Sequence, residues 1–96
     1  MTRKQAAFPD LRAIPGVGPS IAEDLRELGY RQVPDLESED AEQMYERLCA
    51  LRGERLDRCV LYVFRAATYF AGRDRHDPEL LKWWNWTDER MRSRTR

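Results

Sequence analysis

The sequence contains one feature whose residue types and spacing suggest chemistry, a glycine-rich turn at residues 14–18 that reads Ile-Pro-Gly-Val-Gly. Two glycines let the backbone reverse within a few residues and approach a partner closely. The turn leads into a segment with helical hydrophobic spacing, and the first N–H groups of a helix lack partners within it. These donors and the helix dipole favour anions. The pattern predicts a helix-hairpin-helix motif whose turn contacts a phosphate of the DNA backbone.

The predicted contact residues of this first hairpin lie in the turn and the start of the following helix. They are Pro15, Gly16, Val17, Gly18 and Ser20. We expect Val17 to point back between the two helices. A contact of this kind reads no bases. The alternative is that the turn only packs two helices together, since a motif is a hypothesis until its structural context is known.

A second hairpin is predicted from a faint internal repeat. When Gly16 is aligned with Gly53 without gaps, Leu11 meets Leu48 and apolar residues meet at further positions, including Ala22 with Cys59 and Leu25 with Tyr62. Arginines surround the second glycine, and a guanidinium group suits a phosphate. The second-hairpin candidates for DNA binding are Arg52, Gly53, Arg55 and Arg58. An ordinary solvated hairpin explains the same arginines equally well.

The first hairpin alone is expected to bind phosphate weakly. No lysine or arginine follows its second glycine, and the next helix carries Glu23, Asp24 and Glu27. Acidic side chains near a helix N-terminus satisfy the dipole themselves and repel phosphate. We therefore expect the working surface to be the pair of hairpins, with amides from one and guanidinium groups from the other.

The hydrophobic periodicity predicts an all-α fold, a compact five- to six-helix domain with a tandem helix-hairpin-helix (SAM-like) arrangement. We expect a flexible N-terminus at residues 1–7, a single helix-hairpin-helix domain at 8–86 and a polar, arginine-rich tail at 87–96. The predicted helices begin near Pro9, at Pro19 or Ser20, after Asp40, after Asp57 and near Asp77, and a short connector spans 33–36. The helix after Asp57 runs to about Ala71 and is apolar nearly all round, so it belongs in the middle of the domain.

Composition excludes several classes of protein. The chain has 96 residues, of which 42% are hydrophobic and 35% charged, with a formal net charge of +0. It is too apolar to be disordered, and it lacks the apolar run of a membrane span, so we expect a cytoplasmic protein. Cys49 and Cys59 are too few for a disulfide scaffold and are expected to be buried thiols. With no net charge, any contact with nucleic acid must be local.

Catalysis and metal binding are not expected. His76 is the single histidine and sits in a polar loop without an orienting partner or a nucleophile nearby. No cysteine or histidine spacing suggests a zinc site. We therefore expect no enzyme activity, no catalytic residue, no metal site and no cofactor.

The tryptophans near the C-terminal end are unusually dense. Trp83 and Trp84 share a predicted helical face with Leu80, and Trp86 follows closely. The favoured interpretation is a C-terminal helix docked onto the central one. The functional alternative is an aromatic anchor for a protein partner or a stacking platform for a base.

Several blocks of the sequence resemble the pathogenicity-locus (Cdd1) family, whose members are also labelled mitomycin resistance proteins. The resemblance covers roughly residues 8–88 and rests on the glycine turn with its following helix and on residues 45–49, 57–65 and 77–86. It implies a helix-hairpin-helix protein presumed to bind DNA, and it supplies no active site. In the family pattern a lysine often follows the second glycine, where this sequence has Pro19.

Two functional hypotheses follow. The first is an accessory DNA-binding module without sequence preference, in DNA repair or a related stress response. The second is a protein–protein interaction domain that keeps the fold without binding DNA. The oligomeric state is left open by the sequence.

Overall fold

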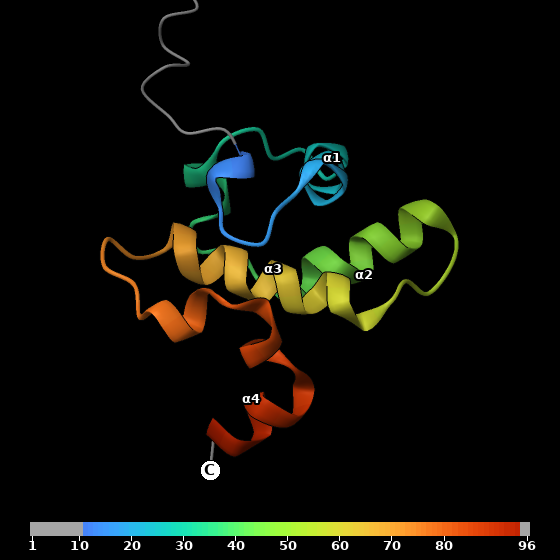
Figure 1. Ribbon diagram of the computed structural model, residues 1–96. Coiled ribbons are helices and arrows are strands. Elements are labelled where there is room, and N and C mark those ends of the chain that lie inside the picture. Colours follow the sequence, from blue (N-terminus) through green and yellow to red (C-terminus); the bar gives the residue numbers. More distant parts are fainter. Residues whose placement is uncertain (1–10, 95–96) are drawn as a thin grey trace, which may run out of the picture.

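The computed structural model describes residues 11–94, and throughout that range the regular structure is helical (Figure 1). The α-helices are α1 (Pro19–Glu27), α2 (Ala41–Arg52), α3 (Arg58–Ala71) and α4 (Asp88–Arg94). Short 3-10 helices join them: η2 (Leu11–Ala13), η3 (Val33–Leu36), η4 (Pro78–Leu81) and η5 (Trp83–Trp86). The all-α fold class is confirmed. The predicted flexible segment at 1–7 and the predicted helix start near Pro9 lie outside the described residues.

The boundaries of the two long helices are those that the capping residues predict. The Asp40 carboxylate accepts hydrogen bonds from the backbone N–H groups of Glu42 and Gln43, and Asp57 accepts one from Cys59. Both side chains satisfy donors that a helix start leaves without partners. Gly53 ends α2 in the left-handed conformation at φ 72°, where an L side chain is strained.

The predicted helices at the two ends of the domain are wrong in form. Ahead of the glycine turn the described part is one 3-10 turn, η2, because Pro15 and Gly16 follow almost at once. The last predicted helix is two 3-10 helices, separated by the extended backbone of Lys82. Part of the predicted polar tail is the helix α4, which has Asp88 and Glu89 in its first turn, where acidic side chains favour helix formation.

Helix α3 lies in the middle of the domain, as its apolar sequence predicts (Figure 1). In Figure 1 the blue and cyan N-terminal elements lie above it and the orange and red C-terminal elements below it, while α2 runs alongside. Leu61, Phe64 and Ala67 have no exposed surface. Burial of this helix on several sides is the main source of apolar stabilisation in a domain of this size.

Two apolar residues near the second turn, Cys59 and Leu51, are at the surface. Cys49 is buried, but Cys59 is exposed, as are the neighbouring Asp57 and Arg58 at the start of α3. Leu51 is 64% exposed in the last turn of α2. The expectation that both cysteines are buried is therefore wrong for Cys59.

The internal repeat follows a different register from the one that the ungapped alignment predicts. The turns at residues 14–18 and 53–57 have equal length, so Pro19, which begins α1, corresponds to Arg58, which begins α3. In this register three residues of α1 and its C-cap, each with exposure of 6% or less, match buried positions of α3. The matched pairs are Ala22 with Leu61, Leu25 with Phe64 and Leu28 with Ala67. Aligning the two glycines instead would pair Ala22 with the exposed Cys59.

The left-handed backbone at Gly53 gives a testable prediction. Gly53→Ala should lower the free energy of unfolding by about 1–2 kcal/mol, because an L residue at positive φ is strained by that amount. Gly53→Asn should cost less, since asparagine adopts this conformation more readily. Urea denaturation of the three proteins measures the difference. An alanine variant as stable as the original chain would contradict the assignment.

Candidate nucleic-acid interface

The first hairpin turn has the geometry that its glycines suggest. Gly16 adopts φ 88°, and Val17 is 6% exposed, with its N–H donating to the Ile14 carbonyl at 3.0 Å. Ile14 is itself 1% exposed. The expectation that Val17 points back into the packing is confirmed. Pro15 is half-buried, so the exposed part of the turn is Gly16 and the residues that open α1.

The N-terminus of α1 is open. Gly18 is its N-cap residue, no side chain caps the helix, and Pro19 occupies the first helical position. Its first turn contains no acidic residue, and Ser20 is exposed. Gly18 has an ordinary φ of −95°, and a Cβ added there would meet nothing within 4 Å. Neither backbone strain nor internal packing therefore requires glycine at this position.

Arg52 of the second hairpin binds the acidic side chains of α1. Its guanidinium donates to Asp24 at 2.6 Å and to Glu27 at 2.9 Å. The hydrogen bonds to Asp24 and then Glu27 raise the pKa of Arg52 above its usual value. Asp24 and Glu27, which the sequence predicts to repel phosphate, are thus paired with a cation of the other hairpin. The third acid, Glu23, lies 3.5 Å from Arg26.

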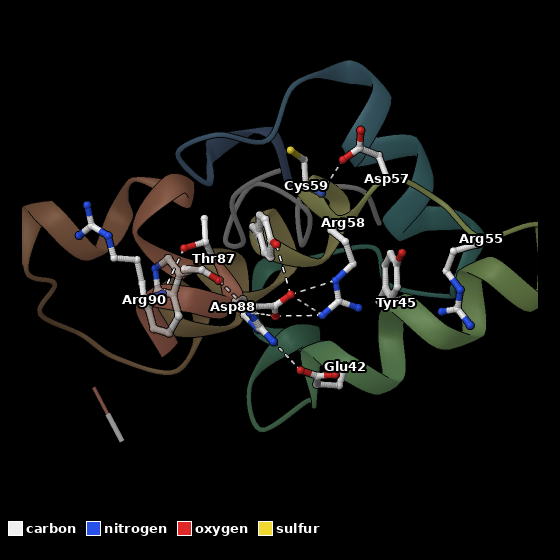
Figure 2. A network of polar contacts seen from close by, with 12 residues as sticks. Glu42, Tyr45, Arg55, Asp57, Arg58, Cys59, Thr87, Asp88 and Arg90 are labelled. Atoms are coloured by element: carbon white, nitrogen blue, oxygen red, sulfur yellow. Dashed lines mark hydrogen bonds and ion pairs between the residues drawn. The ribbon is translucent and has the colours of Figure 1, made fainter. Parts of the chain in front are cut away.

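Arg55 and Arg58 also have acidic partners, and both guanidinium groups lie over the Tyr45 ring. Arg55 donates to Glu46 at 3.0 Å, with 65% of its side chain exposed. Arg58 donates to the Asp88 carboxylate through Nε and Nη2, at 2.7 to 3.1 Å (Figure 2). Of the two, Arg55 is the more accessible to a ligand.

Asp88 is the centre of a polar network that sequence reasoning missed (Figure 2). Besides Arg58, its carboxylate lies 3.1 Å from Arg65 and accepts from the Tyr62 hydroxyl at 3.3 Å. These donors occupy one face of α3, at helical spacing. Arg65 is 8% exposed, and it also donates to Glu42 and to the Trp86 carbonyl. The sequence does contain one signal for this network, because Arg65 interrupts a largely apolar helical segment and a buried cation requires a partner.

The two hairpin turns do not meet. Figure 1 shows the first turn above α3, whereas the second lies at the outer end of α2 and α3. Arg52 alone of the predicted arginines reaches α1, and it does so through acidic side chains and not through the glycine turn. The structure therefore places the predicted residues in two separate groups, one at each turn. Arg52, from the second group, contacts the acidic side chains of α1.

The aromatic segment lies against the first hairpin. A Cβ added to Gly16 would lie 3.7 Å from Cδ1 of Trp83, and Trp83 packs on the core. Trp86 donates its Nε1–H to the Leu80 carbonyl at 2.7 Å. Trp84 is 51% exposed. The core interpretation thus holds for Trp83, whereas Trp84 faces solvent.

His76 takes part in packing rather than standing alone in a polar loop. Its ring stacks on Phe70, and Nε2 lies 2.8 Å from the Phe70 carbonyl oxygen. Through these contacts His76 packs the loop between α3 and η4 against the end of α3.

Comparison with known proteins identifies the family of the chain. The model of the Cdd1 family, described as "Pathogenicity locus", matches residues 4–92. The chain belongs to the Cdd1 pathogenicity-locus family. A relative from Streptomyces lavendulae, named mitomycin resistance protein McrB, is 34% identical over 83 residues, which cover 86% of this chain and 75% of that protein. No solved structure matches the chain significantly.

A helix that crosses a lipid bilayer must be both long and apolar. Within residues 11–94, no helix combines the length and the apolar character needed to cross a membrane.

The Asp88 network predicts a pH dependence of stability. Hydrogen bonding to Arg58, and then to Arg65, lowers the pKa of Asp88 despite partial burial. A lowered folded-state pKa gives stability that is present above the unfolded value of about 3.9 and is lost as the pH falls through the folded value. The original chain should therefore be more stable than Asp88→Asn near neutral pH, and this difference should begin to fall near pH 4 and vanish as the pH passes below the lowered folded-state pKa.

Thermal unfolding of the two proteins from neutral to acidic pH measures this difference. Glu89→Gln is the matched control, because Glu89 is an exposed acid in the same helical turn. A constant difference between the original chain and Asp88→Asn across the pH range would contradict the predicted linkage.

Proposed function

We propose that the protein is an accessory module that binds the DNA phosphate backbone without sequence preference, through a tandem helix-hairpin-helix (SAM-like) arrangement. The observation that carries this proposal is the open N-terminus of α1. Gly18 is glycine without a conformational or packing reason inside the protein. A glycine of this kind is explained by close approach of a partner to the backbone, and a helix N-terminus attracts an anion.

The charge arrangement around α1 supports the same proposal. Arg52 engages Asp24 and Glu27, which reduces the repulsion that these acids would exert on a phosphate. The first turn of α1 carries no acid of its own. The net field near the amide donors is therefore more favourable to an anion than the sequence of the helix alone suggests.

The second hairpin contributes through Arg55 and Arg58. Matched burial of α1 and α3 supports a repeated unit in which each turn precedes a core helix. Arg55 is held to Glu46 only by an exposed ion pair, and such pairs contribute at most about 1 kcal/mol, so a phosphate can compete for the guanidinium. Contacts of this type account for most non-specific binding to DNA.

The biological setting that we propose is DNA repair or a related stress response. The name of the Streptomyces relative, mitomycin resistance protein McrB, supports a role in stress resistance. We further propose that the module has no catalytic activity of its own, because its candidate residues bind and position rather than react.

A protein–protein interaction domain is the second candidate function. Each of the predicted arginines already has an acidic partner, and Leu51 is a large apolar side chain that is 64% exposed beside Arg52. An exposed apolar side chain together with polar side chains that are already paired fits a protein interface, in which an apolar centre is combined with a polar rim.

Substitution at Gly18 separates phosphate binding from folding. Gly18→Asp and Gly18→Ser should raise stability by a few tenths of a kcal/mol, because both residues cap a helix N-terminus better than glycine. Both should weaken DNA binding, and the aspartate should do so more strongly because its charge repels phosphate. Fluorescence anisotropy with labelled DNA at low salt, together with thermal unfolding, measures both effects. Unchanged DNA affinity in the aspartate variant would exclude this contact.

Charge reversal at the second hairpin tests its contribution. Arg55→Glu should weaken DNA binding and lower the slope of log affinity against log salt by about 1, as expected for the loss of one phosphate contact. Arg73→Glu is the matched control, since Arg73 is an exposed arginine over a tyrosine ring at the opposite end of α3. Equal losses in both variants would indicate a general charge effect and count against a local contact.

A further inference from the structure

We propose that the indole of Trp84 stacks on an unpaired nucleobase, so that the protein binds single-stranded DNA more tightly than intact duplex DNA. This inference rests on the proposed contact between the first hairpin and a DNA phosphate. It adds the class of nucleic acid that the same surface selects.

The first observation is the exposure of Trp84. Its neighbours in η5 have structural tasks: Trp83 packs on the core and Trp86 donates to the Leu80 carbonyl. Trp84 is 51% exposed. Water contact with a large aromatic surface is unfavourable, so an indole held at the surface offers substantial apolar area to a ligand.

The second observation is position. The Trp84 ring lies 5.7 Å from the Trp83 ring, centroid to centroid, and the two planes meet at 85°. Trp83 in turn lies beside Gly16. Trp84 is therefore separated from the first hairpin turn by the single side chain of Trp83, so a strand with a phosphate at that turn has to extend only past Trp83 for a base to reach the indole.

The third observation is that the segment is held in place. Asn85 is 7% exposed, and its amide donates to the Glu79 carbonyl at 2.7 Å. The Asn85 carbonyl oxygen accepts from Arg90 at 2.9 Å. Because these bonds fix the backbone on the C-terminal side of Trp84, little conformational freedom is lost when a base stacks on the indole.

These features favour a single strand over a duplex. Bases in a duplex are stacked on one another, whereas those of a single strand are available to aromatic side chains. The chain also has a formal net charge of +0, so a general electrostatic attraction to the more highly charged duplex is absent. Stacking of a base on Trp84 supplies binding free energy that the net charge of the protein does not.

The experiment compares a labelled oligothymidylate with a duplex of equal length by fluorescence anisotropy at low salt. Trp84→Ala should lower affinity for the oligothymidylate by about tenfold, within the range measured for loss of one base–aromatic stack, and leave duplex affinity unchanged. Trp84→Phe, which keeps an aromatic ring, should retain most of the affinity. Thermal unfolding confirms that the variants are folded.

The outcomes distinguish this inference from the function on which it rests. If the original chain binds neither DNA, the proposed function fails and the inference fails with it. If the original chain binds DNA but Trp84→Ala weakens both forms equally or neither, stacking is overturned and phosphate binding stands. Gly18→Asp should weaken both forms together, which separates the phosphate contact from the base contact.

Discussion

Burial of α3 is the constraint on which the rest of the structure depends. A helix that is apolar on most of its surface must be covered on several sides, and a domain of this length has few elements with which to cover it. Helix α2, η3 and the C-terminal 3-10 helices η4 and η5 all pack around it. The positions of both hairpin turns, and of the aromatic segment, follow from the need to cover this one helix.

Charge pairing within the molecule is the second general feature. The sequence contains equal numbers of basic and acidic residues, and many of those in the described part of the chain are paired across elements. Arg52 joins the second hairpin to α1, and Arg58 joins α3 to α4. Such pairs hold elements whose apolar contact is small, and they also leave less charge available to attract a nucleic acid from a distance.

Local signals predicted the interior of the fold well. The aspartate caps at Asp40 and Asp57, the glycine at position 53 and the buried valine of the turn were all recognisable, because each depends on a few neighbouring residues. The ends of the domain were not predictable in the same way. Helix α4 has a polar sequence and depends on Asp88 meeting Arg58, which lies 30 residues earlier in the chain.

The candidate site likewise combines features that the local sequence predicts with features that depend on tertiary packing. The φ of Gly16 follows from the turn sequence, whereas the partners of Arg52, Arg55 and Arg58 depend on tertiary packing. The register predicted for the repeat was wrong because it aligned Gly16 with Gly53 by residue type alone. Glycines with positive φ occupy different positions in the two turns, so identity of residue type at Gly16 and Gly53 does not mark structural equivalence.

The ion pairs of Arg52 have a consequence for the domain as a folding unit. Arg52 belongs to the last turn of α2, yet its partners, Asp24 and Glu27, belong to α1. Asp24 is 9% exposed, and a nearly buried carboxylate without its cation is costly. The stability of α1 is therefore coupled to that of α2, because a separated α1 would leave the Asp24 carboxylate without its cation.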